Sequence, residues 1–245
     1  MAARCIITTS WDDGHPLDFR LAEMLAARDL RATFYIPRNA DTGTMPADKV
    51  RELSRQFEIG AHTLDHVFLD RAPDHQAKVQ IQDSRKWVQD VTGKPCTMFC
   101  PPAGKFAKKH LQMIEDAGYA GVRSVEFFSF DRPRPIGKLL MMPTTLQANP
   151  NGILSYARNL ARRLALRNLW LYVRHGHDTD WARLSNSLLH YFQRAGGVFH
   201  LWGHSWELEA HAQWARLAEV LDLLQSCASD ATTMTNGEIC AAVAQ

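Results

Sequence analysis

The sequence predicts an α/β fold, namely a distorted TIM-like β/α barrel of seven or eight strands, and two observations support this prediction. Short apolar segments of the strand type alternate with amphipathic helical segments along the 245 residues, as in a parallel sheet with crossover helices. In addition, each segment with chemically reactive side chains directly follows a predicted strand. A closed barrel gathers such strand ends on one face, whereas an open doubly wound sheet would distribute them along an edge. The barrel therefore explains the pattern better.

The predicted strands are short and rich in apolar, β-branched or aromatic residues. In chain order they cover residues 5–9, 31–36, 57–61, 97–100, 119–124, 139–142, 168–174, 198–202 and 232–235. The predicted helices repeat apolar residues every three or four positions, and glycine or proline lies near several of their ends. They cover residues 17–28, 46–56, 73–92, 106–117, 151–166, 181–195 and 207–226, and a last helix begins at Gly237. The proline-rich segment 131–137 is expected to be a loop.

Composition and charge narrow the class of protein. No linker divides the chain, so we expect a single domain over residues 1–245. The net charge of +2 favours neither nucleic acid nor a charged membrane as partner, and no apolar run is long enough to span a membrane. The first strand begins close to Met1, which leaves no room for a signal peptide, and the five cysteines form no Cys-x-x-Cys pair. A cytoplasmic location with reduced thiols is therefore expected.

Two polar segments at strand ends predict a metal site. Ser10-Trp11-Asp12-Asp13-Gly14 places two adjacent carboxylates together, which repel each other unless they share a cation or a proton. The later segment His62-Thr63-Leu64-Asp65-His66 places two imidazoles four residues apart, a spacing at which both can bind one ion. A carboxylate and two histidines leave positions open on a divalent ion, as in catalytic sites. Zn²⁺ suits this set best, with Co²⁺, Ni²⁺ or Fe²⁺ as alternatives, whereas a turn-forming aspartate with incidental histidines is the simpler interpretation.

Further polar and aromatic residues lie at the same predicted end of the barrel. Asp12 could act as a general base or pair with an arginine, and these two roles are compatible. His204 follows the strand 198–202 and could protonate a leaving group, while Glu207 could orient His204 or cap the next helix. Trp11, Trp202 and Trp206 are expected beside the site, where they could stack on a sugar or simply pack in the mouth of the barrel.

These motifs resemble those of the polysaccharide deacetylase family, carbohydrate esterase family 4. Ser10-Trp11-Asp12-Asp13-Gly14 is similar to the family's Thr-Phe-Asp-Asp-Gly motif, and residues 62–66 match its His-Ser/Thr-x-x-His motif. Phe99-Cys100-Pro101-Pro102-Ala103-Gly104 resembles the Arg-x-Pro-x-Gly loop, and Trp202-Gly203-His204 resembles the Leu-x-His motif. The motifs follow the family's order over most of the chain.

The resemblance implies a distorted (β/α)₇-like barrel that hydrolyses N-acetyl groups on sugars with the help of a metal. By motif position, the metal ligands would be Asp13, His62 and His66. Asp12 would then be the catalytic base and His204 the catalytic acid. Pro102 would belong to the loop that borders the substrate.

The chain also departs from the family's pattern. Cys100 stands where the third motif usually has an arginine that pairs with the catalytic aspartate, and tryptophan replaces leucine in the last motif. We hypothesise that Arg123, at the end of the following strand, supplies the missing guanidinium, whereas the simpler interpretation makes it a surface cation. The family's fourth motif, an acidic-aromatic pair, is not recognisable. An atypical member is therefore expected.

The function that the sequence favours is removal of an acyl group from an N-acylated sugar, an intermediate rather than an extracellular polymer. One alternative is hydrolysis of a non-sugar amide on the same scaffold. Another is a non-catalytic carbohydrate-binding protein with a degenerate site, which the replacement by Cys100 makes conceivable. His175 and His177 are expected after a strand, either lining the cleft or in a polar loop.

Overall fold

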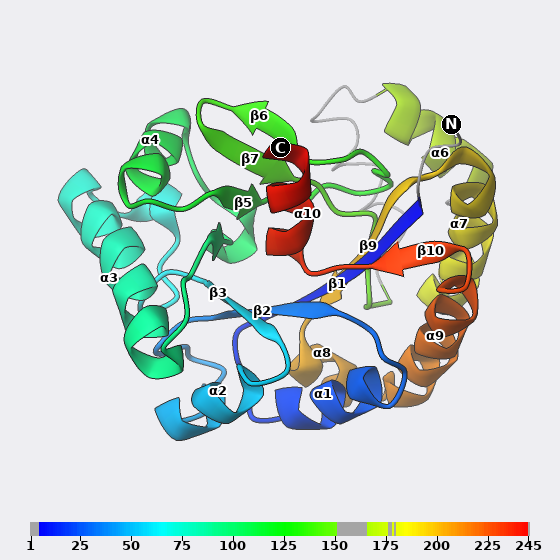
Figure 1. Ribbon diagram of the computed structural model, residues 1–245, viewed down its shortest axis with the longest axis horizontal. Helices are drawn as coiled ribbons and strands as arrows, with labels where there is room; N and C mark the ends of the chain where they lie inside the picture. Colours follow the sequence, from blue (N-terminus) through cyan, green and yellow to red (C-terminus); the bar gives the residue numbers. More distant parts are fainter. Residues whose placement is uncertain (1–4, 151–165, 176–177, 179, 245) are drawn as a thin grey trace.

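The computed structural model describes residues 5–150, 166–175, 178 and 180–244. Its described strands form one ten-stranded sheet with the order β6-β7-β5-β4-β3-β2-β1-β9-β8, and β10 pairs with β1 (Figure 1). The strands are β1 (Cys5–Asp12), β2 (Ala32–Ile36), β3 (Glu58–Ala61), β4 (Met98–Phe99), β5 (Gly121–Arg123), β6 (Arg134–Ile136), β7 (Leu139–Met142), β8 (Leu146–Gln147), β9 (Gly197–Gly203) and β10 (Ala231–Thr233).

Helices surround this sheet on its outer side, and α10 lies across its middle in the view of Figure 1. They are α1 (Asp18–Ala26), α2 (Ala47–Leu53), α3 (Asp74–Thr92), α4 (Lys108–Asp116), α6 (Leu166–His175), α7 (Trp181–Ala195), α8 (Ser205–Ala210), α9 (Trp214–Cys227) and α10 (Asn236–Ala244). Two short 3₁₀ turns, η1 (Leu69–Arg71) and η2 (Pro102–Gly104), complete the set. Among the described residues, no helix is both long and apolar enough to cross a membrane.

Residues 139–147, which contain β7 and β8, close the sheet into a distorted barrel. Strand β7 pairs with β5, strand β8 pairs with β9, and both pairings are parallel. Thr145 N–H donates to the carbonyl of His200 between these two pairings. The only antiparallel pairing among the described strands joins β6 to β7. The predicted β/α barrel is therefore confirmed.

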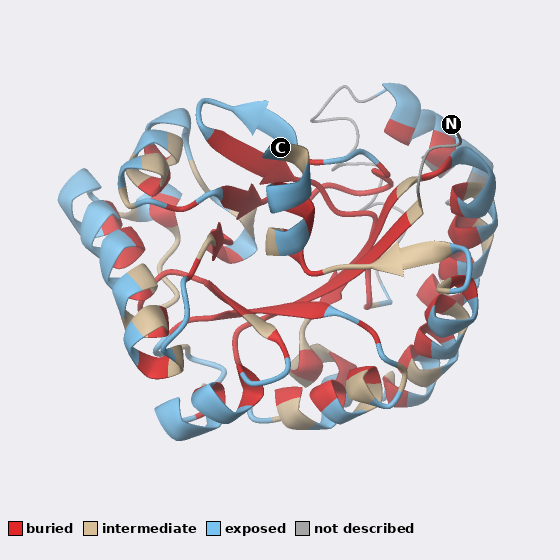
Figure 2. Ribbon diagram, viewed as in Figure 1, coloured by how far each residue is buried: buried red, intermediate tan, exposed pale blue. Residues whose placement is uncertain are grey.

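The pleat of the strands separates two apolar regions. Side chains that point outward from the strands pack beneath the helices, so that the strands other than β6 and β10 are largely buried and the outer helix faces are exposed (Figure 2). Side chains that point inward at the amino ends of the strands form a smaller cluster, which includes Ile6, Met98 and Val198. Ile239 and Cys240 of α10 belong to the same cluster. Helix α10 thus closes the barrel at the end opposite to the motif-bearing strand ends.

Three predicted elements are wrong. Residues 168–174 form part of α6 rather than a strand, because a short apolar run has no periodicity that separates the two possibilities. The predicted helix 207–226 is divided into α8 and α9 at Ala212, whose φ of 51° interrupts the helical backbone. The predicted loop 131–137 contains β6. The predicted helix 151–166 lies outside the described residues except for Leu166, which begins α6.

Candidate active site

The pleat of the barrel strands brings the motif side chains together at one end of the barrel. Along β1, Ser10 bonds His200 of β9 across the interior, at 2.8 Å between Oγ and Nε2. Asp12 lies two residues further along β1 and therefore points to the same side. His62 immediately follows β3, and Arg123 is the last residue of β5. The carboxyl ends of adjacent parallel strands thus supply the site, as the barrel prediction requires.

Asp13, His62 and His66 converge within shared coordination reach. Asp13 Oδ1 lies 3.4 Å from His62 Nε2 and 3.2 Å from His66 Nε2. This oxygen is buried and has no hydrogen-bond partner in the protein, whereas Oδ2 accepts a hydrogen bond from Trp206 Nε1 at 2.8 Å. An unpartnered buried carboxylate oxygen between two imidazole nitrogens is the arrangement that a bound cation would satisfy.

The tautomer of His62 is fixed by its other ring nitrogen. Nδ1 lies 2.6 Å from the carbonyl oxygen of Cys100, which can only accept, so Nδ1 carries the proton. The lone pair of Nε2 therefore faces Asp13, as a metal ligand must. Although Cys100 replaces the family's arginine, its backbone carbonyl thereby orients a candidate metal ligand.

The backbone is strained where these ligands lie. Asp13, Thr63 and His66 have φ values of 79°, 57° and 54°, in the left-handed region that non-glycine residues rarely adopt. Gly14 follows with φ of 63°, and a Cβ there would lie 2.5 Å from a methyl group of Ile36. Glycine is therefore required directly after the two aspartates.

Gln80 of α3 holds the loop that carries the two histidines. Its Oε1 accepts from the backbone N–H groups of Leu64 and Asp65, at 3.0 and 2.8 Å. Its Nε2 donates to the carboxylate of Asp65 at 2.8 Å. This contact is not evident from the sequence, because Gln80 lies on α3, outside the motif and 15 residues beyond Asp65.

The charge state of Asp13 fits a cation site. Burial alone would raise the pKa of the Asp13 carboxyl, but the neighbouring imidazoles of His62 and His66 and the charge of His204 outweigh burial and hold this pKa well below its usual range. A second possible ligand set consists of Asp12, His62 and Cys100. That set fits less well, because burial raises the pKa of the Cys100 thiol far above its ordinary value and Arg123 already binds Asp12.

Arg123 reaches Asp12 from β5, in the position hypothesised for the missing guanidinium. Its Nη2 donates to both carboxylate oxygens of Asp12, and both side chains are buried. Burial would lower the pKa of Arg123, yet the charge of Asp12 raises it above its usual value. The rings of Trp202 and Tyr35 lie 4.8 and 5.3 Å from the guanidinium carbon. Arg123 is therefore a buried partner of Asp12 and not a surface cation.

His204 lies on the other side of Asp12 and is oriented by Glu207. His204 Nδ1 is 2.6 Å from Glu207 Oε2, and Nε2 is 4.0 Å from Asp12 Oδ2. Burial would lower the pKa of His204, but the hydrogen bond to Glu207 and the charges of Asp12 and Asp13 raise it to about 9. His204 is thus protonated at neutral pH. Gln147 of β8 donates to the same Glu207 oxygen at 3.2 Å, a contact the sequence did not predict.

The remaining predicted site residues differ in what they offer a substrate. Trp11 points away from the barrel interior and is fully buried, so its ring offers no surface to a sugar. Trp202 is 6% exposed beside Arg123. Pro102 is buried at the start of η2. Of the other histidine pair, His175 ends α6 rather than following a strand, and His177 lies outside the described residues.

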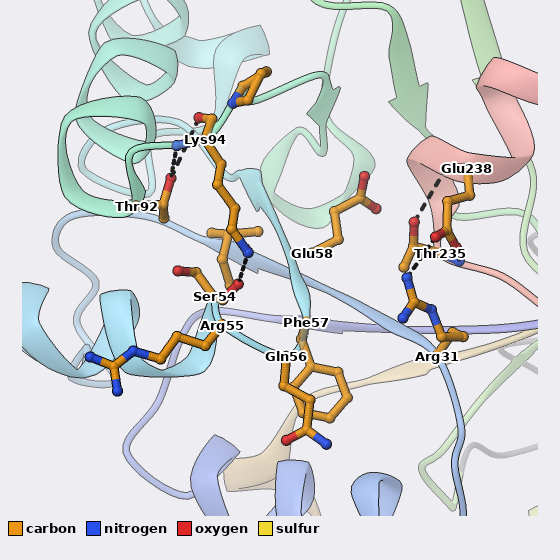
Figure 3. Close-up of a pocket in the computed structure, with 12 residues that line it drawn as sticks. Arg31, Ser54, Arg55, Gln56, Phe57, Glu58, Thr92, Lys94, Thr235 and Glu238 are labelled. Atoms are coloured by element: carbon orange, nitrogen blue, oxygen red, sulfur yellow. Dashed lines mark hydrogen bonds and ion pairs between the residues drawn. The ribbon is translucent and has the colours of Figure 1, made fainter.

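A cavity of about 490 Å³ lies at the opposite end of the barrel (Figure 3). Glu58, the first residue of β3, lines it, together with Arg31 and Lys94. The two cations are engaged within the protein, since Arg31 pairs with Glu238 at 2.6 Å and Lys94 donates to the carbonyl of Ser54. This cavity is remote from the catalytic strand ends and is not the candidate active site.

The fold and these side chains define a β/α-barrel protein with a candidate metal site at the carboxyl ends of its strands. The polysaccharide deacetylase family profile matches residues 3–122, which include the Asp12-Asp13 pair, both metal-motif histidines and Cys100. Residues 3–122 thus match the family that the motifs predicted, the polysaccharide deacetylases of carbohydrate esterase family 4.

Similar proteins agree with this assignment. Peptidoglycan-N-acetylglucosamine deacetylase of Bacillus cereus is 26% identical over 124 residues, which are 48% of this chain and 55% of that protein. A Mycobacterium smegmatis protein assigned to the polysaccharide deacetylases superposes with a TM-score of 0.73 at 13% identity, over 100% of this chain and 91% of the other. The chitin deacetylase of Colletotrichum lindemuthianum superposes with a TM-score of 0.63 at 16% identity, over 97% and 89%. The two structures establish similarity of fold. The chain spans about half the length of the curated relatives it matches.

Proposed function

We propose that this chain is a metal-dependent hydrolase that removes an acyl group, in the first place acetyl, from the nitrogen of a carbohydrate. The observation that carries the proposal is the unpartnered Oδ1 of Asp13 between His62 Nε2 and His66 Nε2. Asp12 and His204, the candidate base and acid, lie close to each other, with His204 Nε2 4.0 Å from Asp12 Oδ2. The deacetylase names of the relatives support the same reaction class.

Asp13, His62 and His66 would hold the divalent ion. Such an ion supplies Lewis acidity toward the acyl carbonyl and lowers the pKa of water. Two neutral imidazoles and one carboxylate suit Zn²⁺, and Co²⁺, Ni²⁺ or Fe²⁺ are further candidates. Trp206 fixes the carboxylate of Asp13 through its other oxygen, so that Oδ1 keeps its direction.

Asp12 would accept the proton of the attacking water. Arg123 holds both of its oxygens and keeps a positive charge beside the carboxylate. The contacts from Arg123 also fix the direction of the Asp12 carboxylate, and a general base requires a fixed direction. Arg123 is therefore proposed as a positioning residue that acts through Asp12.

His204 would donate a proton to the leaving amine. It is protonated at neutral pH because its pKa is raised to about 9, and Glu207 fixes its ring orientation through Nδ1. Nε2 then carries the proton on the side of Asp12. Amide hydrolysis needs both a base and an acid, because a proton must leave the water and another must reach the nitrogen.

The substrate class and location are part of the proposal. We propose an N-acylated sugar intermediate as substrate and the cytoplasm as location, since all five cysteines are free and the contacts of the site need no disulfide. We also propose that the 245 residues form one catalytic domain, because every described strand belongs to one sheet.

Two other functions differ from this proposal in measurable ways. A hydrolase of non-sugar amides would release acid from simple acyl amides and leave acetylated sugars intact. A degenerate carbohydrate-binding protein would bind sugars without turnover. Arg123 binds Asp12 and Glu207 binds His204, so both candidate catalytic side chains are held in place, which favours a catalytic protein over a degenerate binding protein.

Metal binding and turnover test the proposal together. Purified protein should contain close to one equivalent of divalent metal by elemental analysis, and should release acetate from nucleotide-linked or lipid-linked N-acetylhexosamines. His66→Ala should lose both the metal and the activity, because one of three ligands is removed. His75→Ala is the matched control, since His75 is an exposed histidine of α3 outside the site. Metal-loaded protein that hydrolyses no acylated sugar, or activity that survives complete removal of metal, would contradict the proposal.

A further inference from the structure

Helix α6 has an outward face that is unusually apolar for the surface of a protein. Among the large hydrophobic side chains that are exposed in the described part of the chain, four of six belong to this helix. They are Leu166, Leu169, Trp170 and Val173, with exposed fractions of 80, 42, 51 and 57%. Their spacing of three and four residues places them on one side of the helix, and we call this set the α6 stripe.

The opposite side of α6 attaches the helix to the barrel. Leu171 is fully buried, and Asn168 Nδ2 donates to the carbonyl of Phe127 at 2.9 Å. The ring of Trp170 lies 6.1 Å from the ring of Tyr191 in α7. Trp170 is thus the member of the α6 stripe that contacts α7, whereas Leu166, Leu169 and Val173 remain exposed in the described part of the chain.

Cationic side chains border the α6 stripe. Helix α6 contains Arg167 and Arg174 and no acidic residue. Arg174 lies over the ring of Trp170, at 5.9 Å from the ring centre, and Arg167 is half exposed while it pairs with Asp131. A tryptophan and aliphatic residues on one side, with arginines along the border, are the composition of helices that lie in the interface of an anionic membrane.

A second copy of the chain fits the α6 stripe less well. A helix of ten residues is about 15 Å long. One such helix offers much less than the roughly 800 Å² per partner that a stable interface buries. A two-fold contact through the stripe would also bring the arginines of two copies together, whereas lipid phosphates would neutralise them.

We propose that the α6 stripe binds the surface of an anionic lipid membrane. Leu169, Trp170 and Val173 would enter the interface, and Arg167 and Arg174 would contact lipid phosphates. The protein would then be a peripheral membrane protein with no spanning helix among its described residues. This proposal goes beyond hydrolysis and does not depend on it.

Co-sedimentation of the full chain with lipid vesicles tests the proposal. The protein should sediment with vesicles that contain phosphatidylglycerol and remain in solution with pure phosphatidylcholine. The double variant Leu169→Glu with Val173→Glu should lower the bound fraction at least tenfold. Val79→Glu is the matched control, because Val79 is 48% exposed on α3 and lies outside the stripe. This control should bind like the unchanged protein.

A second variant keeps the test decisive if the double variant does not fold. Arg174→Glu leaves the apolar residues intact and should weaken binding to phosphatidylglycerol vesicles several-fold, with a steeper loss at low salt. Circular dichroism checks the fold of each variant. Equal binding of Val79→Glu and the double variant would overturn the proposal. So would a concentration-dependent dimer that the double variant abolishes, or no sedimentation with either vesicle.

Discussion

The two ends of the barrel interior have opposite chemistry, although the same strands form both. At the amino ends, Ile6, Met98 and Val198 pack against Ile239 of α10. At the carboxyl ends, the interior holds Asp12, Arg123 and the metal-motif residues. Along β1 alone, the inward residues change from Ile6 through Thr8 and Ser10 to Asp12.

In a β/α barrel the amino ends of the strands contribute mainly to stability, and the carboxyl ends carry the functional side chains. At the amino end, burial of apolar surface stabilises the barrel. At the carboxyl end, Asp12 and Arg123 are buried as a pair, and removal of one of them leaves the other charge unpaired in a region with little water. Substitutions at the amino end should therefore lower the free energy of unfolding without changing kcat, whereas substitutions at the carboxyl end should lower kcat.

The largest effect is expected where one substitution damages both stability and function. Arg123→Ala leaves the buried carboxylate of Asp12 without its cation, which should lower the free energy of unfolding by about 3–5 kcal/mol and reduce kcat strongly. Urea unfolding and steady-state kinetics measure the two quantities. Arg183→Ala is the control, because it breaks an exposed ion pair with Asp178 and should cost less than about 1 kcal/mol. Unchanged kcat in Arg123→Ala would show that Asp12 needs no guanidinium.

At the amino end, stability should fall without an effect on function. Ile239→Ala removes a fully buried side chain from the inner cluster and should lower the free energy of unfolding by about 2–4 kcal/mol. The kcat of the folded protein should stay within twofold, because Ile239 lies far from Asp12. Val79→Ala, on the exposed side of α3, should change stability by less than about 0.5 kcal/mol. A large fall in kcat for Ile239→Ala would remove the distinction between the two ends.

Metal affinity should depend on the hydrogen bond to the outer oxygen of Asp13. Trp206→Phe removes the indole N–H that bonds Oδ2 and should weaken metal binding about 10–100-fold. Competition with a chelator of known affinity measures the change. Trp214→Phe is the control, since Trp214 also bonds a carboxylate, Glu209, but away from the site. Equal affinities in both variants would count against Asp13 as a ligand.

The smallest effect should be a shift in the pH dependence of kcat. His204 must be protonated to donate, and its pKa is about 9, so kcat should fall as the pH rises through about 9. Glu207→Gln removes the hydrogen bond and charge that raise this pKa, so the decline should begin at lower pH. The difference in kcat between the two proteins should be smallest at the most acidic pH measured, because low pH favours protonation of His204 in both. Glu209→Gln, on the same helix α8, should leave the alkaline limb in place.

Much of the site could be predicted because it follows local patterns. Asp12, Asp13, His62 and His66 belong to short motifs after apolar strands, and the barrel brings such strand ends together. The direction of Arg123 was hypothesised from its place at the end of β5, and the contact with Asp12 agrees. The roles of these residues in catalysis remain predictions.

Other features could not be predicted because they depend on contacts between distant segments. Gln80, Gln147 and Trp206 act through hydrogen bonds to residues that are far away along the chain. The strand predicted at 168–174 is a helix whose inner side carries Asn168 and Leu171, and a short apolar run has no periodicity that distinguishes a strand from a helix. Both kinds of miss have the same origin in tertiary packing.

The position of Asp12 as the final residue of β1 has one more consequence. Asp12 pairs with Tyr35 in the register between β1 and β2, and its neighbour Trp11 faces the helices. Deleting a single residue upstream in this strand would exchange the two directions, placing an indole inside the barrel and a carboxylate under the helices. Two adjacent acids can thus hold separate positions only while the alignment of the first strand with its neighbours is exact to one residue.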